Sequence, residues 1–164
     1  MVEPDYQELT SKDIPVGEQN GVKVKVIAGE YMNIKSPVRT RTPTYYLDFE
    51  MAPNSSHVQN VPEGWTTFIY TLEGVVQADT RMIKAHHTVV FSKAGDSIEF
   101  QNVGQETAAR FVLIAGEPIG EPIVQHGPFV MNTKAEIQQA IEDYQFGKNG
   151  FEKAHKWQSI EGNK

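Results

Sequence analysis

Cysteine is absent from the sequence. This absence excludes disulfide bonds, thiolate metal sites and cysteine nucleophiles. The chain also lacks a run of about 18 apolar residues, so we expect no helix that spans a membrane. The first 13 residues are acidic and lack the apolar stretch of a secretory signal, from which we expect a cytoplasmic protein that is not secreted.

Positive charge is scarce and scattered. The chain has 15 Lys and Arg against 21 Asp and Glu, a net charge of -6. Binding to a phosphate backbone requires clustered basic residues, whereas those here, such as Lys35 and Lys84, stand singly. We therefore expect no direct binding of nucleic acid. The sequence also contains no G-x-S-x-G, P-loop or G-x-G-x-x-G motif, and no catalytic residue is predicted.

The first two thirds of the chain have the pattern of an all-β fold. Apolar and polar residues alternate over 22–26 and 44–50, and longer apolar runs cover 65–72 and 111–116. Short turns separate these segments without intervening helices, which indicates an antiparallel sandwich or barrel of about eight to ten strands over about 20–118. Asp48 and Glu50 alternate with Leu47 and Phe49, so we expect both carboxylates to be solvated.

The last third changes character. Pro118, Pro122 and Pro128 predict an irregular crossover over 117–132. A capping box, Thr133 with Glu136, then opens a helix over 133–147 that ends at Gly147 and leaves a short tail, 148–164. An apolar stripe along this helix predicts that it packs on the outside of the barrel, within one domain of residues 1–164.

Tyr70-Thr-Leu-Glu-Gly74 resembles the end of the first cupin motif, and Asn102 resembles the asparagine of the second. This partial resemblance implies an RmlC-like barrel, or double-stranded β-helix. The ligand positions differ, because Val61 to Glu63, Thr67 and Ile98 stand where cupins place two histidines, a glutamate and a further histidine. A divalent metal needs converging nitrogen or oxygen lone pairs, which this set does not supply.

Three other histidines are low-ranking metal candidates. His86 and His87 are adjacent in a predicted strand, so they point to opposite faces of the sheet. His57, on a predicted loop, could join Glu63 and one of that pair in an improvised site. In the alternative interpretation, one of the adjacent pair is a hydrogen-bonded core residue and the other is solvated.

Longer strings give a more specific resemblance. TPTYYLDFE (42–50), GWTTFIYTLEG (64–74), AHHTVVF (85–91), FVLIAGEP (111–118), QHGPFVMNT (125–133) and KNGFEKA (148–154) resemble the C-terminal half of pirins. This resemblance spans nearly the whole chain. It implies a C-terminal cupin barrel with a closing helix, which in this family follows an N-terminal barrel that holds iron through three histidines and a glutamate.

The resemblance also implies functions. The family is associated with quercetin dioxygenase activity, and in animals it includes a nuclear, iron-dependent transcription cofactor. We expect this chain to be a non-catalytic scaffold and protein-interaction module, without a metal or other cofactor of its own, in the cytoplasm or the nucleus. The alternative is an iron-dependent quercetin 2,3-dioxygenase, or part of one. The chain is a fragment, a truncated gene product or a stand-alone paralogue.

An apolar partner surface is also predicted. Phe129, Val130 and Met131 lie beside Pro128, and Trp65 begins a strand at a loop. We expect the helix to cover most of the 129–131 run. Any apolar patch left exposed marks a surface for an N-terminal cupin domain or another protein partner, or for weak dimerisation.

Overall fold

The computed structural model describes residues 5–159. The chain divides into two compact units, Met1–Pro118 and Ile119–Lys164, which are described separately. The sequence predicts one domain with the helix packed on the barrel, and that packing stays a prediction. Within the described residues, no helix is long and apolar enough to cross a membrane.

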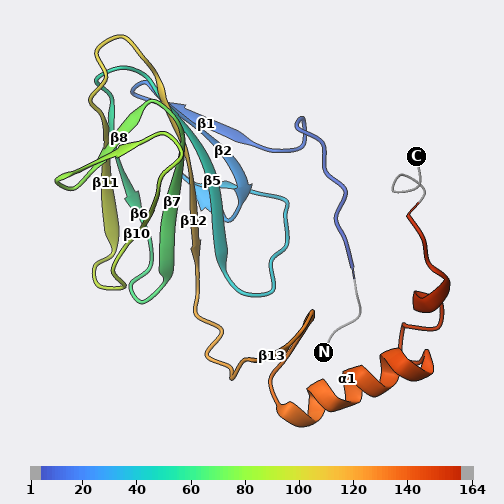
Figure 1. Ribbon diagram of the computed structural model, residues 1–164. Coiled ribbons are helices and arrows are strands. Elements are labelled where there is room, and N and C mark those ends of the chain that lie inside the picture. The colour runs from blue at the N-terminus through green and yellow to red at the C-terminus, as the bar shows by residue number, and fades with distance from the viewer. Residues whose placement is uncertain (1–4, 160–164) are drawn as a thin grey trace. The chain divides into compact units, whose positions relative to one another are not determined.

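The first unit is an antiparallel β-structure built from two main sheets (Figure 1). Six strands pair in the order β1-β2-β5-β12-β7-β10, and four pair in the order β6-β11-β8-β9. A small hairpin, β3-β4, joins β2 to β5. The all-β prediction is confirmed. The strands are β1 (Val16–Gln19), β2 (Val22–Ala28), β3 (Glu30–Tyr31), β4 (Ile34–Lys35), β5 (Thr44–Met51), β6 (Ser56–Asn60), β7 (Thr66–Glu73), β8 (Val75–Ala78), β9 (Arg81–Lys84), β10 (Thr88–Val90), β11 (Ser97–Asn102) and β12 (Ala109–Gly116).

Strand β12 lies in the middle of the six-stranded sheet, between β5 and β7 (Figure 1). Its residues Phe111, Leu113 and Ala115 are fully buried, while the residues between them are half-buried. The aromatic rings of Phe49 and Phe111 stack with centroids 4.8 Å apart, and Phe100 from the other sheet lies 4.8 Å from Phe111. Large apolar side chains therefore fill the space between the two sheets.

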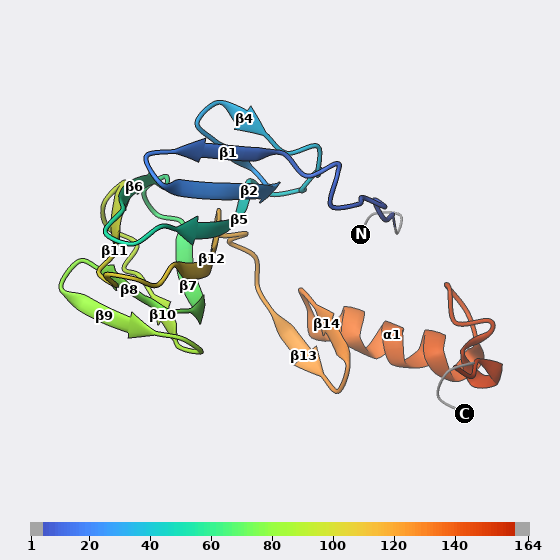
Figure 2. The same cartoon turned by 90° about the horizontal axis from the view of Figure 1, so that it is seen from above.

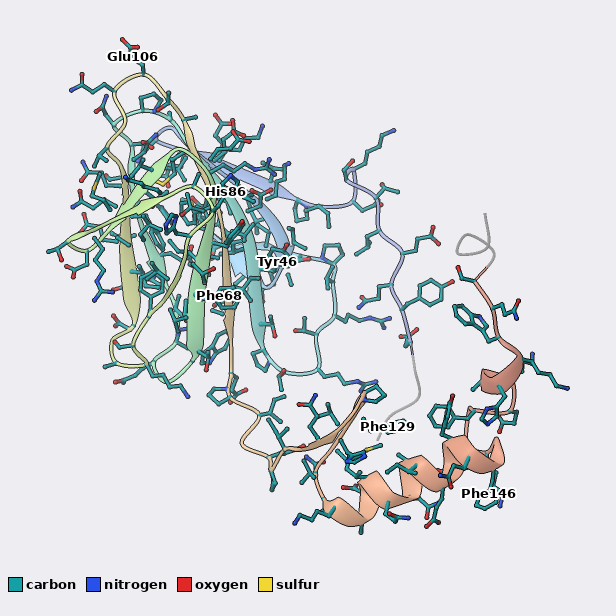
Figure 3. All side chains as sticks on the ribbon, viewed as in Figure 1. Tyr46, Phe68, His86, Glu106, Phe129 and Phe146 are labelled. Atoms are coloured by element: carbon teal, nitrogen blue, oxygen red, sulfur yellow. The ribbon has the colours of Figure 1, made fainter. Side chains whose placement is uncertain are left out.

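Asn102 is the last residue of β11, and its side chain forms hydrogen bonds to several segments at one end of the barrel. Its side chain is 1% exposed. The amide Nδ2 donates to the carbonyl oxygens of Met51, Ala52 and Thr107 at 3.0, 3.1 and 2.9 Å. Its Oδ1 accepts from the backbone N–H of Gly104 at 2.9 Å. One side chain thus fixes the end of β5 against the loop between β11 and β12, whose tip carries Glu106 (Figure 3).

The second unit contains a hairpin and a helix. Strands β13 (Val124–His126) and β14 (Phe129–Met131) pair antiparallel, and helix α1 (Lys134–Phe146) packs on this hairpin and buries Ile137 and Ala140 (Figure 2). A short 3-10 helix, η1 (Ala154–Lys156), follows. The prediction that 117–132 is wholly irregular is wrong, because Gly127, at φ 54°, and Pro128 form a tight turn between two paired strands.

The helix boundaries agree with the prediction. The Thr133 hydroxyl accepts from the backbone N–H of Glu136, and the Glu136 carboxylate accepts from the backbone N–H of Thr133 at 2.8 Å. Gly147 ends the helix at φ 61°, ψ 51°, a left-handed conformation that glycine adopts without strain.

Candidate functional site

Most of the positions that correspond to the cupin metal ligands come together in the first unit, whereas Glu63 is exposed and does not line the hollow that the others share. Val61, Thr67 and Ile98 all line one hollow of about 20 Å³, with Trp65 and Phe91 beside them. Val61 and Thr67 are buried, at 6% and 3% exposed. The only polar side-chain atom that these three positions supply is the hydroxyl oxygen of Thr67.

This hollow does not fit iron. The cupin motif places imidazole and carboxylate ligands at these positions, and the side chains of Val61, Thr67 and Ile98 are two aliphatic groups and one neutral hydroxyl. Such a set offers one weak donor, whereas a divalent ion requires several nitrogen or oxygen ligands around it. A volume of about 20 Å³ is also close to the space that a single water molecule needs.

His57 occupies a different place from the one predicted. It lies within strand β6 and not on a loop, and its half-buried ring rests against Tyr31 and Phe49, with centroids 5.3 and 5.6 Å away. Burial lowers the pKa of His57 below its ordinary value, and a 3.5 Å contact with Gln59 Oε1 opposes this shift only in part. The imidazole is therefore neutral at physiological pH.

The predicted improvised site does not form. His86 and His87 lie in the turn between β9 and β10, with His86 at φ 64°, and not in a strand. Both side chains are exposed, so the interpretation that one of them is a core residue is also wrong. His86 Nδ1 lies 3.4 Å from the hydroxyl of Tyr70, and His87 Nδ1 donates to the carbonyl of Ala85 at 2.9 Å.

Glu63 is exposed in the turn before β7. Throughout residues 5–159, no group of three or more His, Cys, Asp or Glu side chains is placed to hold a metal ion. The histidines that sequence reasoning selected are thus distributed between a half-buried strand position and an exposed turn.

Asp48 also differs from its prediction. It is 8% exposed and not solvated, and it is held by Arg110 through two hydrogen bonds of 3.0 and 2.8 Å. Lys25 Nζ lies 3.9 Å from the same carboxylate. These bonds raise the pKa of Arg110. The three charges belong to neighbouring strands β2, β5 and β12, and they stabilise the sheet without forming a reaction site.

The predicted partner surface divides into covered and exposed residues. Trp65 is half-buried and packs on Tyr45, with ring centroids 5.1 Å apart. Phe129 meets the ring of Phe151 edge-on at 6.1 Å and is half-buried, as is Met131. Val130 remains 57% exposed. Figure 3 labels Phe129 on the hairpin and Phe146, itself 70% exposed, on the helix.

Sequence reasoning missed a larger pocket near His57. It has a volume of about 270 Å³ and lies between the β3-β4 hairpin and strand β6. Its lining includes Glu30, Tyr31, Tyr45, His57 and Gln59. The period-two spacing of His57 and Gln59 places both on one face of a strand, but the hairpin residues are distant in sequence and no local pattern links them to that face.

Comparisons with known proteins assign the chain to a family. Residues 46–150 match the family described as the pirin C-terminal cupin domain. Pirin-like protein 2 from Arabidopsis thaliana is 57% identical over 97% of this chain and 51% of its own length. Human pirin is 53% identical over 99% of this chain and 57% of its own.

A solved structure agrees with this assignment. The crystal structure of quercetin 2,3-dioxygenase from Acinetobacter baumannii matches 90% of this chain and 51% of its own chain, with 36% identity and a TM-score of 0.78. This chain spans about half the length of the curated relatives it matches. The sequence, the two-sheet cupin fold and these matches together place the chain in the pirin family, as a pirin C-terminal cupin domain.

Proposed function

We propose that this chain is a non-catalytic cupin barrel of a pirin, and that it acts as a scaffold and protein-interaction module beside a metal-bearing barrel. The observation that carries this proposal is the hollow of about 20 Å³ at the cupin ligand positions, where Val61, Thr67 and Ile98 replace metal ligands. In this proposal, iron binds to the half of the pirin relatives that this chain does not match.

The interior of the barrel supports a structural role. Phe49, Phe100 and Phe111 are fully buried and in ring contact with one another. An oxygenase that acts on a flavonol needs an open cavity in which substrate and oxygen meet. Aromatic side chains occupy that space here, and close packing of this kind stabilises a rigid support.

The proposed interaction surface includes Val130 on the hairpin of the second unit, which is 57% exposed. Its partner is an N-terminal cupin domain or another protein, in the cytoplasm or the nucleus, and the isolated chain forms a weak dimer through the same surface. Sedimentation velocity tests this. The Val130→Lys variant should lose self-association, whereas Val90→Lys, a matched change at a 67% exposed position of β10, should keep it.

The catalytic part is tested by metal loading. Chain incubated with Fe(II) without oxygen and then desalted should retain less than about 0.1 iron per chain, because its ligand positions lack imidazole and carboxylate. Quercetin, followed by absorbance, should disappear no faster than with free iron. One iron per chain that is lost in His57→Ala and kept in His126→Ala would contradict the proposal.

The alternative is that the chain forms part of a quercetin 2,3-dioxygenase. The likeness to the Acinetobacter baumannii enzyme favours it, since that protein shares the fold at 36% identity. In this case the present chain would hold its partner barrel in position while the partner binds iron. Quercetin consumption by a two-barrel pirin that includes this chain, but not by this chain alone, would agree with both the scaffold proposal and this alternative.

A further inference from the structure

The pocket between the β3-β4 hairpin and strand β6 has the properties of a small-molecule site. At about 270 Å³ it is near the lower end of the size range of ligand pockets. Both sides of it belong to the first unit. Met32 and Asn33, at φ 47° and 67°, form the tight turn that carries the hairpin over the pocket.

Three of the lining residues carry rings, namely Tyr31, Tyr45 and His57. Tyr31 and His57 lie in ring contact, with centroids 5.3 Å apart and planes at 54°. Tyr45 is also in the lining, and its ring packs on the ring of Trp65. Aromatic surfaces fixed in this way favour a planar ligand, and they attract a cation through their ring faces.

Gln59 and His57 supply acceptors to the pocket. Gln59 Nε2 donates to the carbonyl of Asn60 at 2.8 Å, so Gln59 Oε1 faces His57 Nε2 as an acceptor. His57 then carries its proton on Nε2, and its Nδ1 is left with a lone pair. The ring is neutral because burial lowers the pKa of His57.

The charge of the pocket is negative. Glu30 is in the lining, and neither Lys nor Arg is found among the nine described residues that form it. Burial and the Glu30 carboxylate together raise the pKa of Tyr45. Lys35 Nζ lies 3.6 Å from Glu30, but both side chains are at least half exposed, so water weakens this pair.

One buried group in the lining lacks a partner. Tyr31 is 3% exposed, and no hydrogen-bonding group among the described residues lies within reach of its hydroxyl. Buried hydroxyls are rarely left in this state, and each one carries a desolvation cost. This oxygen has less than 1 Å² of accessible surface, so an occupant of the pocket does not reach it.

From these features we propose that the pocket binds a small planar aromatic ligand that carries a cationic or neutral N–H donor group, such as an amidine, and that it rejects carboxylates of the same shape. The ring of the ligand packs against Tyr45 and His57, and its N–H groups donate to Glu30 and His57 Nδ1. This site is separate from the hollow at the cupin ligand positions.

The test uses the whole chain and three probes of one shape. Benzamidine, benzamide and benzoate are titrated into ¹⁵N-labelled protein, and backbone amide shifts are followed by NMR. We expect saturable binding in the order benzamidine, benzamide, benzoate, with shifts centred on residues 30–33 and 57–60. Equal or tighter binding of benzoate, shifts centred elsewhere, or no saturable shift with benzamidine up to about 10 mM would overturn the proposal.

Two variants test the recognition itself. Glu30→Gln, at an exposed position that cannot disturb the core, should weaken benzamidine about 3- to 10-fold and leave benzamide nearly unchanged. Glu18→Gln on β1 is the matched control and should change neither. Tyr31→Phe removes a buried hydroxyl that has no partner, so it should raise the melting temperature of the free protein and leave benzamidine binding nearly unchanged. An unchanged affinity of Glu30→Gln for benzamidine would contradict the proposal.

Discussion

Replacement of Asn102 should destabilise the barrel more than any surface change. The Asn102→Ala variant leaves three backbone carbonyls and one N–H without their side-chain partner at a position that is 1% exposed. At roughly 1 kcal/mol for each lost partner, the free energy of unfolding should fall by about 3–5 kcal/mol. With about 4 °C for each kcal/mol, the melting temperature should fall by about 12–20 °C.

Asn102→Asp is the sharper form of this experiment, because it keeps the shape and replaces the donor by a carboxylate that faces carbonyl oxygens. Burial would raise the pKa of the new carboxyl in the folded state above its unfolded value of about 3.9. Relative to the wild type, the stability of this variant should therefore be highest below about pH 4 and fall as pH rises toward the folded pKa.

The assay is urea unfolding followed by circular dichroism between pH 3 and 8. Gln105→Ala, an exposed change in the same loop, is the control and should cost less than about 0.5 kcal/mol. A loss below about 1 kcal/mol in Asn102→Ala would refute the role given to this side chain. So would an Asn102→Asp variant whose stability relative to the wild type is greatest at neutral pH.

Three further outcomes follow from single contacts. Burial lowers the pKa of His57, so the unfolded state binds the proton of this residue first as pH falls below about 6.5. The free energy of unfolding should therefore decrease as pH falls through this range. In His57→Gln, the free energy of unfolding should depend less on pH between about pH 7 and 5. Asp48→Asn should lower the free energy of unfolding in urea by about 1–2 kcal/mol, because its pair with Arg110 is bidentate but the guanidinium is partly exposed. The same loss measured in an Arg110→Ala background would contradict this pairing. Thr133→Ala should cost about 1 kcal/mol and speed amide exchange in α1, whereas Thr133→Ser should leave both unchanged.

Local patterns in the sequence predicted much of the fold. Alternation over 22–26 matches the buried residues Val22, Val24 and Val26 of β2, because one face of that strand packs on the core. The capping box and Gly147 predicted both ends of α1, since helix ends are determined by nearby residues. Val61, Thr67 and Ile98, which the alignment to the cupin motif selected, also line one hollow in the structure.

Features that depend on distant neighbours were not predictable in this way. Asp48 was placed on the correct face of its strand, but the partner that buries it, Arg110, is 62 positions away. The turn at His86 needs a positive φ, which histidine rarely adopts, so the apolar residues after it favoured a strand. The prolines of 117–132 favoured irregular backbone, although Pro118 and Pro122 precede the β13-β14 hairpin and Pro128 lies in its turn.

The central claim is that the cupin ligand positions of this chain hold no iron, and diffraction at the iron absorption edge tests it most directly. Crystals of the chain would be soaked anaerobically in Fe(II), and an anomalous difference map would be calculated. The account predicts no peak in the hollow lined by Val61, Thr67 and Ile98. An ordered iron peak in that hollow, bonded to Thr67 or to main-chain oxygens, would contradict it.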